Sequence, residues 1–410
     1  MAFGESEVDA QLQSAWQQFC RQLEAAGERV FKDNNPATEI HRADAFRFLT
    51  QNLGQAFDLA LETRDSRYPM IHPFCTPTRK LGGDAADFTY HQAWIDGQSC
   101  YRVSGERGSA RFINFTVQGE RPDKQPGTDI PSLHDPFGDI PEANLFGHQM
   151  QIDDDGRFEL YIGGPERDGN WLPTTAKTRK LFIRQGFDDW SESPALLTIE
   201  RLDMTEPRPV MTADSLTDAM AWAGIFVEAV MTDWPDHPYQ YSPFVDPVGV
   251  NRFPPDPAAA AGQDDQKRGR AVANLCWQLA EDEALIIEFA PPDSFWMVSA
   301  MGVFFNSLDY LYRPVSYTPA RTALDDDGKV RIVVCQHDPG FHNWLDTQGF
   351  ERGNICYRNL LSTATAEFAT QVVSLADLSE VLPLSQRVSA EERQQQMQQR
   401  FDSIRRRYRI

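Results

Sequence analysis

The stretches 153-DDDGRFELYIGGPERDGNWLPTTAKTRKLFIR-184 and 325-DDDGKVRIVVCQHDPGFHNWLDTQGFERGNICYR-358 follow one pattern, and that pattern decides the fold. Each stretch begins with an acidic turn and continues through a strand pattern, an Asn-Trp-Leu loop and a second strand pattern that ends at an arginine. Gly156 and Gly328 are 172 residues apart, and Arg184 and Arg358 are 174 apart, so the spacing hardly drifts. A shared order over this length predicts two related β-modules in one chain.

The spacing of apolar residues outside the repeat changes along the chain. In the first 62 residues they recur every three or four positions, which predicts helices. From about residue 66 the period falls towards two, which predicts strands. Near the C-terminus, Ser389-Ala390-Glu391-Glu392 is a capping box that predicts a helix start. The fold predicted is therefore mainly β with peripheral helices, built on two jelly-roll-like antiparallel β-sandwich modules.

The domain boundaries follow from these changes of pattern. The segments predicted are a helical segment at residues 1–64, a first β-sandwich module at 65–212, a helical connector at 213–283, a second β-sandwich module at 284–385 and a C-terminal helix at 386–410. Within the connector we expect an exposed linker at 254–270 and then an amphipathic helix. Its apolar residues are Val272, Leu275, Trp277 and Leu279.

Three further local structures are predicted. The strand patterns on either side of Gly105 and Gly108 are typical of a hairpin, and the two strands of each repeat are expected to form one as well. The proline-rich segment 122–141 predicts a long surface loop, because proline lacks the N–H that a sheet requires.

The charge and cysteine content restrict the class of protein. Thirty-nine basic and 60 acidic side chains give a net charge of −21, which argues against nucleic acid or an anionic membrane as a partner. No run approaches the roughly 18 to 20 apolar residues of a membrane span. The N-terminus is acidic, unlike a secretory signal. Six scattered cysteines without a CxxC pair indicate free thiols in a reducing cytosol, although Cys335 and Cys356 were candidates to face each other, so we expect a cytoplasmic protein.

The densest group of titratable residues lies in the second repeat. His337 and Asp338 are adjacent, and an imidazole oriented by a carboxylate is a suitable general base. We therefore predict His337 as the base and Asp338 as its partner, with Arg358 and Tyr312 stabilising negative charge. A divalent metal held by this loop and a merely solvated loop remain the alternatives; the site predicted contains no metal and needs no cofactor.

Aromatic and polar residues around this group are predicted to bind a substrate. The set comprises Trp344, Asn343, His342, Trp296, Asn306 and His91. A tryptophan is suited to stacking on a flat ligand, and an arginine to holding an anion. The structural alternative is that each Asn-Trp-Leu element only closes the end of a sandwich. The presence of an arginine in both copies favours that alternative, since a single active site needs only one.

Several strings resemble the bacterial family built around the domain of unknown function numbered 1214. They are 337-HDPGFHNWLDTQGFERGNICYR-358, 284-ALIIEFAPPDSFWMVSAMGVFFNSLDYLYRP-314, 89-TYHQAWIDGQSCYRVSGERGSARFINFTVQG-119 and 169-GNWLPTTAKTRKLFIRQGFDDW-190. The resemblance spans about residues 65 to 375 and implies a jelly-roll-like β architecture, in tandem in some members. It implies no reaction. His91 and His342 depart from the family's pattern.

These observations favour an enzyme that acts on a small hydroxylated organic substrate, such as a ring, a sugar or a lipid-derived molecule. Cofactor-free acid–base chemistry is expected, so the class is hydrolase, lyase or isomerase. The alternative is a non-catalytic protein in which the same residues bind a ligand or another subunit. A homo-oligomer is compatible with the apolar N-terminal helices.

Overall fold

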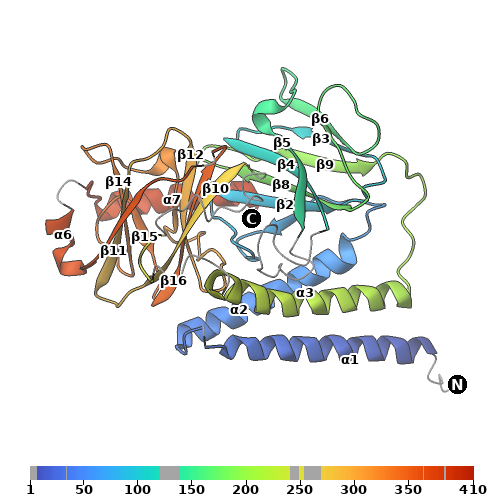
Figure 1. The fold of residues 1–410 in the computed structure, drawn as a ribbon, viewed down its shortest axis with the longest axis horizontal. Coiled ribbons are helices and arrows are strands. Elements are labelled where there is room, and N and C mark those ends of the chain that lie inside the picture. Colours follow the sequence, from blue (N-terminus) through green and yellow to red (C-terminus); the bar gives the residue numbers. More distant parts are fainter. Residues whose placement is uncertain are drawn as a thin grey trace.

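The computed structural model describes residues 7–33, 35–120, 139–240, 249–253, 269–362, 364–382 and 385–410. The loop predicted at 122–141 lies mostly outside these residues, and the linker predicted at 254–270 lies almost entirely outside them. In the described part, two β-sandwich modules stand side by side over a layer of long helices (Figure 1). The predicted fold class is thus confirmed, with two sandwich modules and peripheral helices.

The helical layer consists of α1 (Glu7–Glu28), α2 (Glu39–Phe57) and α3 (Ala213–Gln240). Helices α1 and α3 run alongside each other beneath the modules (Figure 1). The predicted N-terminal helices are confirmed. Thr38 is the N-cap of α2, and its side chain accepts a hydrogen bond from the His41 backbone N–H. None of the described helices combines the length and apolarity that a membrane span requires.

The described residues of the first module form nine strands. They are β1 (His72–Cys75), β2 (Phe88–Trp94), β3 (Tyr101–Glu106), β4 (Phe112–Gly119), β5 (Ile140–Phe146), β6 (Arg157–Ile162), β7 (Trp171–Leu172), β8 (Thr178–Gly186) and β9 (Leu196–Arg201). They form a sheet of order β1-β2-β8-β4-β5, here called the β8 sheet, and a sheet of order β7-β6-β3-β9. The inner faces of the two sheets enclose one apolar core that includes Tyr101, Phe115 and Phe158.

The second module repeats this arrangement. Its strands are β10 (Arg270–Gln278), β11 (Glu283–Phe289), β12 (Phe295–Met301), β13 (Ser316–Tyr317), β14 (Val330–Cys335), β15 (Trp344–Asp346), β16 (Arg352–Leu360) and β17 (Phe368–Ser374). They form a sheet of order β10-β16-β12-β13, here called the β16 sheet, and a sheet of order β15-β14-β11-β17. Strands β2 to β9 and β10 to β17 therefore have the same order in the two modules, which makes the repeat a duplication of the whole sandwich.

Short helical turns and the C-terminal helix complete the chain. The 3-10 turns are Arg29–Phe31, Gly147–Gln149, Pro319–Arg321 and Leu375–Asp377, a π-helical turn at Asp58–Glu62 extends α2, and the last two helices are α6 (Leu378–Val381) and α7 (Ala390–Tyr408). The predicted capping box is confirmed: the Ser389 hydroxyl accepts from the Glu392 N–H at 3.2 Å, and Glu392 accepts from the Ser389 N–H at 2.7 Å.

The amphipathic helix predicted after the linker is wrong, because this segment is strand β10, which pairs along its whole length with β16. Nearly every residue of β10 is buried, since one face meets the sandwich core and the other meets the rest of the protein. A short segment that is apolar on both faces has no period-two signal, so its spacing resembled that of a helix.

The predicted hairpins are also wrong. Strand β3 pairs with β6 and β9, whereas β4 belongs to the β8 sheet. Within each repeat the two strands again lie in different sheets, because a short parallel strand (β7 or β15) follows the first strand before the chain crosses to the opposite sheet. Cys335 and Cys356 consequently sit in different sheets, and all six cysteines are free.

The Asn-Trp-Leu elements are scaffold in both modules. The Asn170 amide donates to the carbonyls of Gln151 and Glu159 and accepts from the Gln151 N–H, at 2.8 to 2.9 Å. Asn343 makes the same three bonds to the backbone of Ala323 and Arg331, at 2.8 to 3.0 Å. A buried amide with this pattern fastens the strand after the acidic turn to the segment before it.

The tryptophans that follow these asparagines also make equivalent hydrogen bonds in the two modules. The indole N–H of Trp171 donates to the Gly163 carbonyl at 3.2 Å, and that of Trp344 donates to the Cys335 carbonyl at 3.0 Å. The indole nitrogens are therefore used within the fold. The structural alternative stated for these elements is the one the structure supports.

A buried carboxylate links both modules to α7. Asp87, just before β2, is fully buried, and the Arg321 guanidinium of the second module lies 2.6 Å from it. The buried Arg400 and Arg407 of α7 act on the same carboxylate with their positive charges. Helix α7 is held between the modules in this way, and the C-terminus lies near the centre of the molecule (Figure 1).

We predict that Asn170→Ala and Asn343→Ala each lower the free energy of unfolding by about 2–4 kcal/mol, because each removes three hydrogen bonds and leaves buried backbone groups unsatisfied. Urea unfolding followed by circular dichroism measures this. His337→Ala, at an exposed position, is the control with a change within about 0.5 kcal/mol. Wild-type stability in both asparagine variants would contradict the scaffold role.

Candidate functional site

The predicted His337–Asp338 pair does not form. The His337 side chain is 59% exposed, and its Nε2 lies 3.4 Å from Glu281 Oε1. Asp338 instead accepts two hydrogen bonds from the Arg393 guanidinium of α7, at 2.9 and 3.2 Å, and one from the Gly340 N–H. The carboxylate is used to close its turn and to dock α7, so it cannot orient the imidazole.

The remaining residues predicted in this region are scattered. His342 is partly buried, and burial lowers its pKa, while its Nδ1 lies 3.1 Å from Asn343 Oδ1. Tyr312 is 65% exposed and packs on Phe401 at the surface. The indole of Trp296 is buried in the core of the second sandwich, with its ring centroid 5.1 Å from that of Phe289.

Asn306, predicted to bind substrate, is buried beside helix α2, where its amide interacts with the Asp44 carboxylate. The structure therefore does not bring the predicted group together. Within the described residues, no cluster of three or more histidine, cysteine, aspartate or glutamate side chains has the arrangement of a metal site.

Arg358 lies in a different region from His337 and Asp338. It lies on the outer face of β16 and is buried, and its Nη2 donates a hydrogen bond to the Gly83 carbonyl in the loop before β2. The Gly83 N–H donates in turn to the Phe305 carbonyl at 2.7 Å. Arg358 thus points out of its own sandwich and into the junction between the two modules.

A pocket of about 160 Å³ lies at this junction. We call it the inter-module pocket. The described residues that line it are Phe74, Cys75, Leu81, Gly82, Gly83, Asp84, Tyr90, Gln92, Gln118, Asp139, Lys180, Phe182, Arg184, Trp234 and Arg270. They come from β1, β2, β4, β8, α3, β10, the segment between β1 and β2, and the position just before β5, so both modules and the helical layer contribute.

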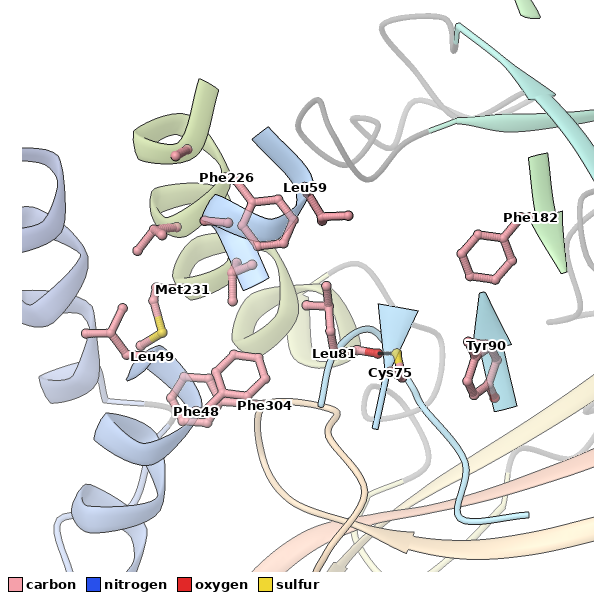
Figure 2. Packing of buried hydrophobic residues seen from close by; sticks show 14 of the residues in the cluster. Phe48, Leu49, Leu59, Cys75, Leu81, Tyr90, Phe182, Phe226, Met231 and Phe304 are labelled. Carbon is pink, nitrogen blue, oxygen red and sulfur yellow. Dashed lines mark hydrogen bonds between the residues drawn. The ribbon is translucent and has the colours of Figure 1, made fainter. Parts of the chain in front are cut away.

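The wall of the pocket is the outer face of the β8 sheet. The register of β2, β8 and β4 sets its side chains in three rows, which are Tyr90–Arg184–Asn114, Gln92–Phe182–Thr116 and Trp94–Lys180–Gln118. Tyr90 and Phe182 lie on the neighbouring strands β2 and β8, beside Cys75 (Figure 2). Phe182 is the centre of this array, and the Arg184 guanidinium carbon lies 4.4 Å from its ring centroid.

Positive charge from both modules converges on the pocket. Arg184 of β8 and Arg358 of β16 hold equivalent places in the two repeats, and the charges of both act on the Cys75 thiol. Arg270 of β10 lines the pocket, and its charge acts on the Tyr90 hydroxyl together with that of Arg358. Of the two duplicated arginines, Arg184 lines the pocket, and Arg358 binds the carbonyl of the lining residue Gly83.

The two acidic side chains of the pocket already have described partners. Asp139 is paired with Arg179 and with Lys180. Asp84 accepts from the Ser307 N–H at 2.9 Å and from the Ser307 hydroxyl at 2.5 Å. Arg184 and Arg270 line the same pocket, and a guanidinium is suited to pairing with a carboxylate.

The ionisable groups in the pocket are shifted by burial. Burial raises the pKa of Tyr90 to about 12, against the effect of the Arg358 charge, so this phenol stays protonated at neutral pH. Burial also raises the pKa of the Asp84 carboxyl, while the Lys80 charge lowers it. The pKa of the Cys75 thiol is raised well above its usual value by burial, which makes this thiol a poor nucleophile.

Two glycines allow the loop to pass close to the pocket. Gly82 and Gly83 have φ values of +64° and +72°. A Cβ at Gly83 would lie 2.5 Å from the Phe305 ring, and one at Gly82 would lie 3.0 Å from the Trp234 ring. Only glycine therefore suits both the backbone conformation and the space, and these positions fix the Gly83 carbonyl that Arg358 binds.

His91 does not reach the inter-module pocket. It follows Tyr90 in β2, so its side chain points to the opposite face of the sheet. It lines a separate, open groove of about 1010 Å³, whose other walls include Pro73, Glu159 and Arg409. Burial lowers the pKa of His91 to about 4.

Among the described residues that line the pocket, Arg184 is the one that the sequence repeat marked; its counterpart Arg358 binds the Gly83 carbonyl of the lining. Tyr90 directly precedes His91, which the sequence predicted as a substrate-binding residue. Cys75, Asp84 and Arg270 belong to segments without a motif, and nothing in their spacing shows that they meet.

We predict that His91 makes stability depend on pH. The unfolded chain binds its proton near pH 6.5 and the folded protein near pH 4, so the unfolded state binds more protons between these values, and stability falls as the pH drops through that window. The contribution at pH 5 is about 2 kcal/mol less favourable than at pH 7. Urea unfolding at both pH values should show that this loss is absent in His91→Gln. The same pH dependence in both proteins would refute the prediction.

Comparisons with known proteins place the chain in a family. No family model matches the sequence, and no curated protein matches it. The crystal structure of the VPA0106 protein from Vibrio parahaemolyticus aligns at 10% identity with a TM-score of 0.43, over 86% of this chain and all of that one, which is too weak to indicate function. An uncharacterized protein from Burkholderia cenocepacia has a crystal structure that aligns at 31% identity with a TM-score of 0.80, over 90% of this chain and 99% of that one. The chain belongs to the same family as this Burkholderia cenocepacia protein.

Proposed function

We propose that this protein is an enzyme that binds a small organic anion in the inter-module pocket and acts on it by cofactor-free acid–base chemistry. The observation that carries the proposal is that Arg184 of the first module and Arg270 of the second line one pocket together with Tyr90 and Asp84, while the charge of Arg358 acts on Tyr90 and Cys75 there.

Anion binding follows from the chemistry of arginine. A guanidinium presents several N–H donors in a fixed plane and pairs with both oxygens of a carboxylate. Hydrogen bonds of this kind are stronger in a buried site, where water competes less for them. Because the arginines come from separate modules, a bound anion would also hold the modules together.

The acid–base step is assigned to Tyr90 and Asp84, two groups whose pKa values are both raised by burial. Tyr90, protonated at neutral pH, is suited to donate a proton. Asp84 has a raised pKa, which brings its carboxylate closer to the basicity that a general base needs. This pair replaces His337 and Asp338, which lie apart from the pocket.

A non-catalytic ligand-binding protein is the second candidate. It is favoured by the two hydrogen bonds that Ser307 donates to Asp84, since a carboxylate held in this way is typical of a structural role. In that case the same arginines bind the ligand, and no turnover follows.

The wider assignments of the proposal rest on the sequence. Its strings support membership of the family around the domain of unknown function 1214. The acidic composition and free cysteines support a cytoplasmic location. A homo-oligomer is supported by apolar side chains exposed on the helical layer, among them Trp16 at 55% and Phe46 at 42%.

We predict that Arg184→Gln and Arg358→Gln each weaken binding of small carboxylates at least tenfold, which is the effect of losing about 1.4 kcal/mol from a charged hydrogen bond. Isothermal titration with acetate, propionate and lactate measures this. Arg157→Gln is the control with the same change of net charge, at a residue whose side chain is 69% exposed. Undiminished binding in Arg184→Gln would refute the site.

We predict that Tyr90→Phe lowers turnover about 100-fold or more and leaves affinity nearly unchanged, because it removes only the proton that the phenol donates. Small hydroxy acids incubated with the protein in D₂O are followed by proton NMR for product or for exchange at carbon. His337→Ala should retain full activity. Binding without turnover in the wild type would favour the second candidate.

A further inference from the structure

The groove that His91 lines takes its walls from both sheets of the first sandwich. Its volume is about 1010 Å³, and its described walls include residues of β1, β2, β3, β6 and β9. We call it the sandwich groove. The apolar residues of its lining are Ile71, Pro73, Pro77, Phe158, Pro194, Ala195, Leu196 and Leu197. It shares no described lining residue with the inter-module pocket, so it is separate from the site of the proposed function.

The second sandwich has aromatic rings where the first has this groove. Gly105 of β3 pairs with Leu197 of β9. At the equivalent places, Phe289 of β11 pairs with Phe368 of β17, and their ring centroids lie 5.5 Å apart. Both Gly105 and Phe289 also pair with the second residue after the glycine of the acidic turn, which establishes the equivalence. A Cβ at Gly105 would lie 2.0 Å from the Leu196 carbonyl oxygen, so no side chain fits there and the space between the sheets stays open.

His91 provides a polar group in this apolar space. It pairs with Ile183, whereas the equivalent pair of the second module is Ala273 and Tyr357. No described residue forms a hydrogen bond with either ring nitrogen of His91. Its Nδ1 is buried, which leaves Nε2 as the nitrogen at the groove surface. Burial lowers the pKa of His91 to about 4, so at neutral pH the ring is uncharged and able to bond a neutral ligand.

Positive and negative charges are nearly balanced around the groove. Arg79, one of its basic residues, is paired with Asp58 at 2.9 Å. Glu159, one of its acidic residues, is paired with Arg102, also at 2.9 Å. The other charged residues of the described lining have both signs and are Glu106, Asp153, Arg157, Arg407 and Arg409. An ionised ligand would therefore lose its hydration here without gaining a matching counter-charge.

We infer that the sandwich groove binds an uncharged, mainly apolar molecule and holds a hydroxyl group of that molecule at Nε2 of His91. Binding sites for such molecules are generally apolar, with a few polar groups that fix the orientation. A hydroxyl both donates and accepts, so it can bond Nε2 whichever ring nitrogen carries the proton. A cavity of about 150 Å³ holds benzene, so the groove has room for a molecule of at least two fused rings.

The test compares two-ring probes that differ in one substituent. β-Naphthol and naphthalene are titrated into the full-length protein, and binding is followed by their fluorescence. We expect β-naphthol to bind about five- to tenfold more tightly than naphthalene, as one net hydrogen bond provides. β-Naphthoate, which is ionised, should displace β-naphthol only at ten or more times the concentration.

Two variants place the probe in the groove. Leu197→Phe introduces a ring where the second sandwich has Phe368, and should weaken β-naphthol binding tenfold or more. Leu324→Phe, at a position 48% exposed in the second module, is its matched control. His91→Phe keeps a ring and removes both nitrogens, so β-naphthol and naphthalene should then bind equally. His337→Phe, at a position 59% exposed, is the control for this change.

The comparison on the unaltered protein needs no variant. If β-naphthol does not bind, or if naphthalene binds equally well, the inference is overturned. A preference for β-naphthol that survives in His91→Phe, once urea unfolding has shown this variant to be folded, overturns it as well. Crystals soaked with brominated β-naphthol provide a second location: a bromine signal between the sheets beside His91 supports the inference, and a signal elsewhere overturns it. Carboxylate binding at the inter-module pocket is tested separately through Arg184→Gln, so either proposal can fail while the other stands.

Discussion

The junction of the two modules depends on one buried carboxylate. Asp87 belongs to the first module, Arg321 to the second, and Arg400 and Arg407 to the C-terminal helix, so a single acidic group holds three parts of the chain. Removing one partner of a buried ion pair generally destabilises a protein by about 3–5 kcal/mol, because the other charge is left without compensation. The pocket exists only where the modules meet, so its geometry depends on this contact.

The duplicated architecture could be predicted because the acidic turn and the asparagine contact of each repeat require particular residues at fixed spacing. An acidic turn needs glycine at positive φ, as at Gly156 and Gly328, and the strand after it is fastened by the asparagine amide. These requirements can be recognised in the sequence. The sheet partners of each strand cannot, because β3 and β4 show the alternation of apolar and polar residues expected of a hairpin although they belong to opposite sheets.

The candidate site could not be predicted in the same way. Its residues come from β1, β2, β8 and β10, and each of them taken alone is an ordinary cysteine, tyrosine or arginine. His337 and Asp338 attracted the prediction because they are neighbours in the chain. Adjacent residues in a turn often point apart. The Asp338 carboxylate is bound by Arg393, which lies 55 residues further along the chain. The repeated arginines were the sequence feature that lay nearest to this site. Their presence in both copies, however, favoured a structural role over an active site.

The two halves of the chain share a topology and differ in chemistry. Strand neighbours of Arg184 are Tyr90 and Asn114, whereas those of Arg358 at the equivalent positions are Val272 and Met297. Polar partners thus flank the arginine in only one of the modules. Under the proposed function, the second copy therefore supports the first copy's site, and its own described strands place no polar neighbours beside Arg358. One ligand per chain is then expected at this face, so that the repeat enlarges a single site without doubling it.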